Sequence, residues 1–193
     1  MSFIPIFKIG VWNAWIFMSI FVLQMLVIIF ARKSVSERSH VPKKVQRNRL
    51  ERYTGIIAHI SWLLALGYSI FLPFQVGTIW FYIGLFVFIF GLILMTMATI
   101  DFITATPEQL IKKGAYRFSR HPIYLATFLI CLGAGVASVS FIFIFLSIIM
   151  AFCLNKEALI EERYCFDKYG RAYQEYLNNV SMWINLPKRI RDG

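Results

Sequence analysis

The sequence predicts an all-α integral membrane protein with about five membrane-spanning helices, the last two a short hairpin, followed by a cytosolic helical segment. Of its 193 residues 59% are hydrophobic and only 16% are charged, a more apolar balance than soluble domains show. The charged residues leave three long uncharged stretches, and the basic residues gather on one side of them. We treat residues 1–193 as a single membrane domain, because no soluble core of this size could bury so many apolar runs.

The uncharged stretches define the predicted spans. A charge at the centre of a bilayer costs ~2.5–3.5 kcal/mol on insertion scales, so a long run without Asp, Glu, Lys or Arg indicates a membrane helix. A span needs about 20 residues. Residues 9–31 therefore fit one helix and residues 53–100 fit two. Residues 121–155 are too many for one helix and few for two, which favours a hairpin of short helices.

In chain order, the expected spans are residues 11–31, 53–72, 78–100, 121–137 and 138–154. Pro73 and Gly77 mark the turn between the second and the third span. The small residues from Gly133 to Ser140 mark the turn of the hairpin. The first span is expected to be a retained helix rather than a signal peptide, because it has little basic leader and no small-residue cleavage site.

Two shorter helical segments are expected outside the spans. Thr106 is a suitable N-cap with Pro107 at the first helical position, so an interfacial helix is expected to start there and to end at Gly114. After the last span, the composition of residues 156–176 is typical of a helix, interrupted at Gly170.

The basic residues set the predicted orientation. The chain has 20 Lys and Arg residues, and all but Lys8 lie in residues 32–52, in residues 101–120 or after residue 155. Five spans place these three segments on one side, which the positive-inside rule makes cytoplasmic. We therefore expect the N-terminus outside and the C-terminus inside, in the cytoplasmic membrane of a prokaryote. Anionic lipid head groups explain the net charge of +10 better than nucleic acid does.

Two polar clusters flank the predicted hairpin. One contains Arg120, His121 and Pro122, and the other contains Glu161 and Glu162. The hairpin returns the chain to the same depth, so the two clusters are expected to meet. Pro122 suits a helix start, where backbone N–H groups favour an anionic ligand, and the glutamates can accept hydrogen bonds from hydroxyl or ammonium groups.

Other interpretations of these clusters remain open at this point. Tyr, Arg and His at a membrane surface often form only an interfacial belt, and adjacent glutamates often only complement a helix dipole. The cysteines, Cys131, Cys153 and Cys165, show neither C-x-x-C spacing nor a nearby histidine pattern, so neither a disulfide nor a metal site is predicted.

The two clusters carry a family resemblance. The pattern Gly114-x-Tyr116-x-x-x-Arg120-His121-Pro122-x-Tyr124, then Glu161-Glu162, then Tyr169-Gly170-x-x-Tyr173-x-x-Tyr176 resembles the isoprenylcysteine carboxyl methyltransferases and the related phospholipid N-methyltransferases. The resemblance covers about residues 110–186. It implies an integral membrane methyltransferase that transfers a methyl group from S-adenosylmethionine to a lipophilic acceptor, which is a prenylcysteine-like carboxylate, a lipid amine or a lipid thiol.

The resemblance also implies a cofactor-binding region over about residues 108–176. Its cofactor-binding candidates are Glu108, Gln109, Leu110, Ile111, Gly114, Tyr116, His121, Pro122, Ile123, Tyr124 and Glu161. Arg120, His121 and Glu162 are the catalytic candidates, with Arg120 and His121 at the carboxylate end of the cofactor. Prenylcysteine enzymes of the family carry an arginine one turn before the first glutamate; Glu157 stands there in this chain and is the substrate-binding candidate. Glu162 or Glu157 would act as general base for a protonated amine.

Two other functions compete with the methyltransferase. Sterol reductases, which use NADPH, end in a similar Arg-His-Pro and Lys-Tyr-Gly pattern, and Lys168-Tyr169-Gly170 resembles it. They are usually longer and have more spans. A membrane scaffold of the same fold without activity is the third candidate, and it would bind neither cofactor.

Overall fold

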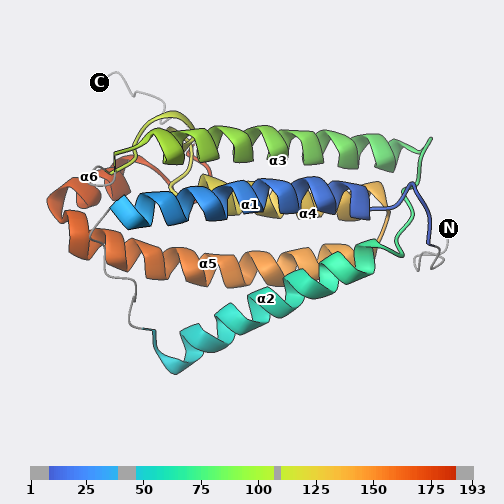
Figure 1. Cartoon of the computed structure of the whole chain (residues 1–193), viewed down its shortest axis with the longest axis horizontal. Helices are drawn as coiled ribbons and strands as arrows, with labels where there is room; N and C mark the ends of the chain where they lie inside the picture. The colour runs from blue at the N-terminus through green and yellow to red at the C-terminus, as the bar shows by residue number, and fades with distance from the viewer. Residues whose placement is uncertain (1–8, 39–46, 107–109, 186–193) are drawn as a thin grey trace, which may run out of the picture.

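The chain folds into six α-helices, in the computed structural model that describes residues 9–38, 47–106 and 110–185. The helices are α1 (Trp15–Arg38), α2 (Arg49–Ser69), α3 (Ile79–Thr104), α4 (Pro122–Ala137), α5 (Phe141–Tyr169) and α6 (Arg171–Asn179), with a 3₁₀ helix, η1 (Gly114–Arg117), between α3 and α4. Helices α1, α3, α4 and α5 run along the long axis. The C-terminal end of α2 lies beside α5, and the axis of α2 moves away from α5 toward the N-terminal end of α2 (Figure 1). The all-α prediction is confirmed.

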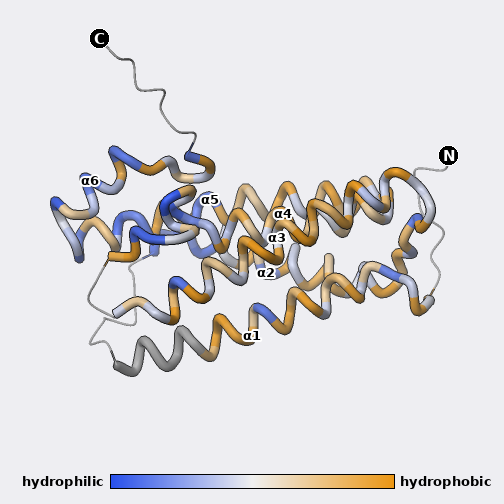
Figure 2. Tube along the Cα trace, turned by 90° about the horizontal axis from the view of Figure 1, so that it is seen from above, coloured by the Kyte–Doolittle hydropathy of each residue, from blue (hydrophilic) through white to orange (hydrophobic). Residues whose placement is uncertain are grey.

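Apolar side chains cover the outside of the helices. On α3 the side chains of Phe86, Phe90 and Ile93 are all more than half exposed, and on α5 the same is true of Phe145 and Phe152. A soluble protein rarely exposes such continuous apolar faces, whereas a lipid environment requires them. Figure 2 shows the hydrophobic residues along the helix bodies and the hydrophilic ones gathered around α6 and the neighbouring end of α5. The chain is therefore a membrane protein.

The predicted count of five spans is met in part by the length and composition of the helices. Among the described residues, α3 and α5 are long and apolar enough to cross a membrane. Two shorter apolar helices, Trp15–Phe30 within α1 and α4, accompany them. Helix α2 starts with Arg49, Glu51 and Arg52, so its apolar part begins later. The orientation and the five spans stay predictions.

Helices α3 and α4 pack backbone against backbone. A Cβ atom added at Gly133 would lie 2.6 Å from the Phe88 nitrogen and 2.7 Å from the Gly84 oxygen. A Cβ atom at Gly84 would overlap the backbone of Ala137. Small residues that allow helices to approach this closely are typical of helix contacts in membranes, where packing replaces the hydrophobic effect.

The hairpin turns where the sequence predicts it, but its second helix is longer than predicted. Ser140 caps α5, since its hydroxyl accepts a hydrogen bond from the backbone of Phe143 at 3.3 Å. Helix α5 then runs without a break to Tyr169, far beyond the predicted end of the span at residue 154. Gly170, with φ of 51°, separates α5 from α6, as predicted. The long α5 carries the glutamates from the membrane into the polar end.

The predicted interfacial helix before the hairpin is wrong in the part that the structure describes. Pro107 lies outside the described residues, and the residues from Leu110 to Lys113 form no helix. Gly114 does not end a helix but starts η1. Its positive φ of 57°, a left-handed conformation that favours glycine, here turns the chain into η1.

Candidate functional site

The start of α4 places His121 at the polar end of the helices. Pro122 is the first residue of α4, as predicted, and His121 is the N-cap residue just outside the helix. The backbone nitrogen of His121 donates to the Ser119 hydroxyl at 3.1 Å. The C-terminal half of α5 passes beside this corner and presents Glu161 and Glu162 to it. The two clusters that the sequence places 40 residues apart therefore meet in space.

Arg120 connects three segments of this corner. Its Nε donates to Glu162 Oε1 at 2.8 Å, and its Nη1 donates to the Val180 carbonyl at 2.6 Å and to the Leu177 carbonyl at 3.4 Å. The side chains of Arg120 and Glu162 are only 12% and 14% exposed. The guanidinium thus joins the start of α4 to α5 and to the end of α6.

His121 lies between the two glutamates. Its Nε2 is 3.2 Å from Glu162 Oε1, and its Nδ1 is 3.7 Å from Glu161 Oε2. The imidazole is 8% exposed and stacks on the ring of Tyr124, with centroids 5.7 Å apart and planes 6° from parallel. The hydroxyl of Tyr124 donates to Glu161 Oε1 at 2.6 Å. These four side chains form one connected group, which we call the histidine corner: His121, Tyr124, Glu161 and Glu162.

The charges of the histidine corner shift the pKa values in opposite directions. Burial alone would lower the pKa of His121, but hydrogen bonds and the negative charges of Glu161 and Glu162 outweigh it and raise the pKa above its usual value. Burial alone would raise the pKa of Glu162, but hydrogen bonds from His121 and Arg120 outweigh it and lower the pKa. The corner therefore favours a protonated imidazole between carboxylates.

The loop before the corner is shaped by a carboxylate. The backbone nitrogen of Ala115 donates to Asp101 Oδ2 at 2.8 Å, and a Cβ atom at Gly114 would overlap that carboxylate. The carbonyl of Tyr116 accepts a hydrogen bond from the Tyr176 hydroxyl at 2.6 Å, which attaches η1 to α6. Leu110 and Ile111 are half-buried in this loop. Glu108 and Gln109, two of the predicted cofactor contacts, lie outside the described residues.

A C-terminal segment crosses the corner, which the sequence did not predict. The backbone nitrogen of Arg120 donates to the Ser181 carbonyl at 3.1 Å, and that of Asn185 donates to the Phe118 carbonyl at 2.7 Å. The Ser119 hydroxyl donates to the Met182 carbonyl at 3.0 Å. These bonds bring the Trp183 ring to 6.3 Å from the His121 ring. The apolar residues Val180, Met182, Trp183 and Ile184, after the polar end of α6, were the available signal.

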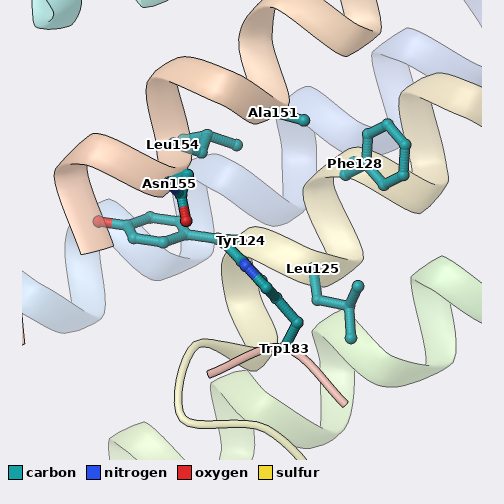
Figure 3. A pocket seen from close by; sticks show the side chains of 7 residues that line it. All are labelled: Tyr124, Leu125, Phe128, Ala151, Leu154, Asn155 and Trp183. Carbon is teal, nitrogen blue, oxygen red and sulfur yellow. The ribbon is translucent and has the colours of Figure 1, made fainter. Parts of the chain in front are cut away.

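An apolar pocket of about 250 Å³ adjoins the histidine corner between α4 and α5 (Figure 3). It is lined by Tyr124, Leu125 and Phe128 of α4, by Ala151, Leu154 and Asn155 of α5, and by Trp183. Tyr124 belongs both to the pocket and to the corner. Asn155 was missed by the sequence analysis, although a lone amide at the end of an apolar run was a signal that could have indicated it.

Glu157 does not join the histidine corner, because its carboxylate pairs with Arg47 instead. Its two carboxylate oxygens accept from Arg47 at 2.9 and 2.7 Å, a bidentate pair in which the Glu157 side chain is 16% exposed. A second pair, Arg163 with Glu51 at 2.6 Å, also joins α5 to the start of α2. Glu157, the predicted substrate-binding residue, therefore pairs with the residue just before α2. The structure does bring together Arg120, His121, Glu161 and Glu162.

Comparison with known proteins gives the family. A sequence profile of the phospholipid methyltransferases matches residues 74–172, just over half of the chain. The matched range runs from the turn before α3 into α6 and contains the whole histidine corner. No curated protein matches the chain. Members of the family use S-adenosylmethionine as methyl donor, so the match decides for the methyltransferase family over the NADPH-dependent reductases. The chain therefore belongs to the phospholipid methyltransferase family and is an S-adenosylmethionine-dependent methyltransferase of a lipid acceptor.

Proposed function

We propose that methyl transfer takes place where the histidine corner meets the apolar pocket. One observation carries the proposal: Tyr124 donates to Glu161 in the charged corner and at the same time lines the apolar pocket. A charged cofactor and a lipophilic acceptor need such neighbouring sites, because one requires polar partners and the other requires apolar walls. The acceptor is a lipid amine, a lipid thiol or a prenylcysteine-like carboxylate.

The residues of the corner fit S-adenosylmethionine by the chemistry of their donors and acceptors. The cofactor carries a carboxylate, an ammonium group and two ribose hydroxyls. His121 and the backbone N–H groups of Ile123 and Tyr124, in the helical turn that Pro122 begins, suit the carboxylate. The Glu161 side chain is 41% exposed and suits the ammonium or the hydroxyls. Leu110, Ile111, Gly114 and Tyr116 are proposed as further walls of the same site.

When bound, the cofactor supplies a methyl group on a positively charged sulfur, already activated for in-line displacement. The residues of this chain then have to orient the acceptor and exclude water. Tyr124 and Trp183 form apolar walls between the corner and the lipid side. His121, whose raised pKa favours the protonated form, hydrogen-bonds Glu162 and lies beside Glu161, which keeps the corner in one arrangement.

Arg120 and Glu162 are proposed as positioning residues rather than as direct contacts of the acceptor. The Arg120 guanidinium is bound to Glu162 and to two carbonyls of the C-terminal segment. Glu157 is held by Arg47. For a protonated amine acceptor, Glu161 is the best general base of the three glutamates, since its side chain is the most exposed, at 41% against 14% and 16%.

The arrangement in the membrane follows the predicted orientation. With five spans, the histidine corner lies at the cytoplasmic surface, where S-adenosylmethionine is made available, and the apolar pocket opens toward the lipid. The basic residues exposed near the corner, Lys112, Lys113 and Arg117, are then placed at the level of the inner head groups.

Cofactor binding in detergent tests the proposal. His121→Ala and Glu161→Ala are each expected to weaken S-adenosylmethionine binding at least tenfold in titration calorimetry, because each removes a polar partner. Gln174→Ala, on the exposed face of α6, is the matched control and should bind as the wild type does. Unchanged affinity in both corner variants, with helix content preserved by circular dichroism, would refute the site.

A further inference from the structure

Asn155 is a polar side chain in an apolar surrounding. It lies on α5 next to Leu154 and one turn after Ala151, and all three line the pocket between α4 and α5. In Figure 3 its carboxamide lies beside the ring of Tyr124, on the pocket side of α5. Asn155 is half-buried, and within residues 9–38, 47–106 and 110–185 the structure gives its side chain no hydrogen-bond partner, so its amide is accessible from the pocket.

An amide in this position calls for a partner. A carboxamide has two N–H donors and one acceptor oxygen, and placing it against apolar walls without a partner costs free energy. A leucine or alanine at this position would complete the apolar lining at no such cost. The amide therefore indicates a polar group that enters the pocket with a ligand.

The charges around the pocket restrict what that group is. None of the seven lining residues is charged. The nearest arginine of the site, Arg120, is bound to Glu162 and to the carbonyls of Leu177 and Val180. His121, which stacks on Tyr124 of the lining, lies between Glu161 and Glu162. An anion at Asn155 would therefore find no cation among these groups that is not already paired with a carboxylate, so a neutral hydrogen-bonding group fits better than a carboxylate.

The walls on the other side of Asn155 fit a hydrocarbon chain. Leu125 and Phe128 follow Tyr124 along α4, and Ala151 precedes Asn155 along α5, so the lining becomes wholly apolar away from the histidine corner. The pocket has a volume of about 250 Å³, and its apolar end suits the first carbons of the acceptor next to its polar group.

We propose that Asn155 is an acceptor-binding residue, whose amide hydrogen-bonds the polar end of the lipid acceptor and orients it toward Tyr124 and the histidine corner. The inference rests on the proposed function, because the corner is where the cofactor is placed. It adds that the reacting end of the acceptor is uncharged when bound, with its apolar chain running along Phe128 and Ala151.

The test compares Asn155→Leu with the wild type in two separate measurements. Leucine has the same branched shape, with the same number of side-chain heavy atoms, and removes the hydrogen-bonding groups; Asn155→Gln, which also adds bulk, controls for its larger volume. Titration calorimetry with S-adenosylmethionine in detergent should give the same affinity within twofold. Transfer of labelled methyl groups is measured in mixed micelles that contain one of three probes: phosphatidylethanolamine, hexadecanethiol or N-acetyl-S-farnesylcysteine.

The expected result is activity on the amine or the thiol and not on the farnesylcysteine carboxylate. Asn155→Leu should raise KM for the active probe about tenfold, the value of one lost hydrogen bond. Asn155→Gln, which keeps the amide, should recover part of that loss. Gln174→Leu is the matched amide-to-leucine control on exposed α6 and should behave as the wild type.

The opposite outcomes are distinguishable. A tenfold loss of cofactor affinity in Asn155→Leu would assign the pocket to the cofactor and overturn the inference, while leaving the proposed function intact. Wild-type KM in Asn155→Leu, or transfer only to the farnesylcysteine carboxylate, would overturn it as well. A wild-type protein that binds cofactor but methylates none of the three probes also contradicts it. Absence of cofactor binding in the wild type would instead refute the proposed function.

Discussion

Arg120 and Glu162 form a nearly buried ion pair of 2.8 Å although 42 positions separate them in the sequence. The pair connects the two ends of the hairpin, and the carbonyls of Leu177 and Val180 extend it to the C-terminal segment. A charge that loses its partner in such a place is far more costly than the pair itself is favourable.

The first prediction concerns this pair. Arg120→Met should lower the free energy of unfolding by about 3 kcal/mol, because Glu162 is left without its main cation. It should also release the segment after α6, whose carbonyls lose their donor. Reversible unfolding in mixed detergent measures the first effect, and limited proteolysis of the C-terminal segment measures the second.

The double variant Arg120→Met/Glu162→Met distinguishes the effect of the ion pair on stability from its effect on cofactor binding. It removes both charges together, so most of the stability should return. Cofactor affinity should stay reduced, since His121 loses one of its two carboxylates. A double variant as unstable as Arg120→Met alone would contradict the importance of the pair, and full cofactor affinity would contradict its positioning role.

The second prediction is a pH dependence of stability that His121 produces. The folded-state pKa of His121 is raised above the usual value of a histidine, because Glu161 and Glu162 lie beside it, so the imidazole binds its proton more tightly in the folded chain than in the unfolded chain. The contribution of His121 to the free energy of unfolding is therefore fully present below pH ~6.5, the pKa of an unfolded histidine. It is lost as the pH rises from there through the raised pKa of the folded state. The difference in unfolding free energy between the wild type and His121→Gln should shrink over this range.

Measurement of that difference between pH 5.5 and 9 in one detergent checks the sign. Glu162→Gln serves as a second variant, because without that carboxylate the folded-state pKa of His121 falls, so the loss should be smaller and should end at lower pH. A difference that grows with pH would show that burial dominates and that the imidazole is neutral in the corner.

The sequence predicted the parts of this molecule that depend on the membrane and on local chain direction. Uncharged stretches located the apolar helices, because a charge in lipid is costly wherever it occurs. Pro122 predicted the start of α4, and Gly170 predicted the break after α5. The meeting of Arg120 and His121 with Glu161 and Glu162 followed from the hairpin alone, since a hairpin returns the chain to its starting depth.

The parts that could not be predicted depend on long-range contacts. The pairing of Glu157 with Arg47 joins positions 110 residues apart, and nothing local to either residue indicates it. The segment with Trp183 is held at the corner by backbone hydrogen bonds, which any sequence can form. The loop at Gly114 takes its shape from Asp101, a residue that the sequence shows only as the end of an uncharged stretch.

The third prediction concerns that loop. Gly114 has φ of 57°, and a Cβ atom there would overlap the Asp101 carboxylate, which accepts a hydrogen bond from the Ala115 nitrogen. Gly114→Ala should therefore destabilise the fold by about 1–3 kcal/mol, through the left-handed backbone and the displaced carboxylate. It should also weaken S-adenosylmethionine binding, because the displaced loop leads into η1 and the histidine corner.

The variant Gly114→Ala/Asp101→Ala relieves the overlap but not the backbone strain, so unfolding experiments should show the two changes to be less than additive. Strictly additive losses, or a Gly114→Ala protein as stable as the wild type, would show that the carboxylate does not shape the loop.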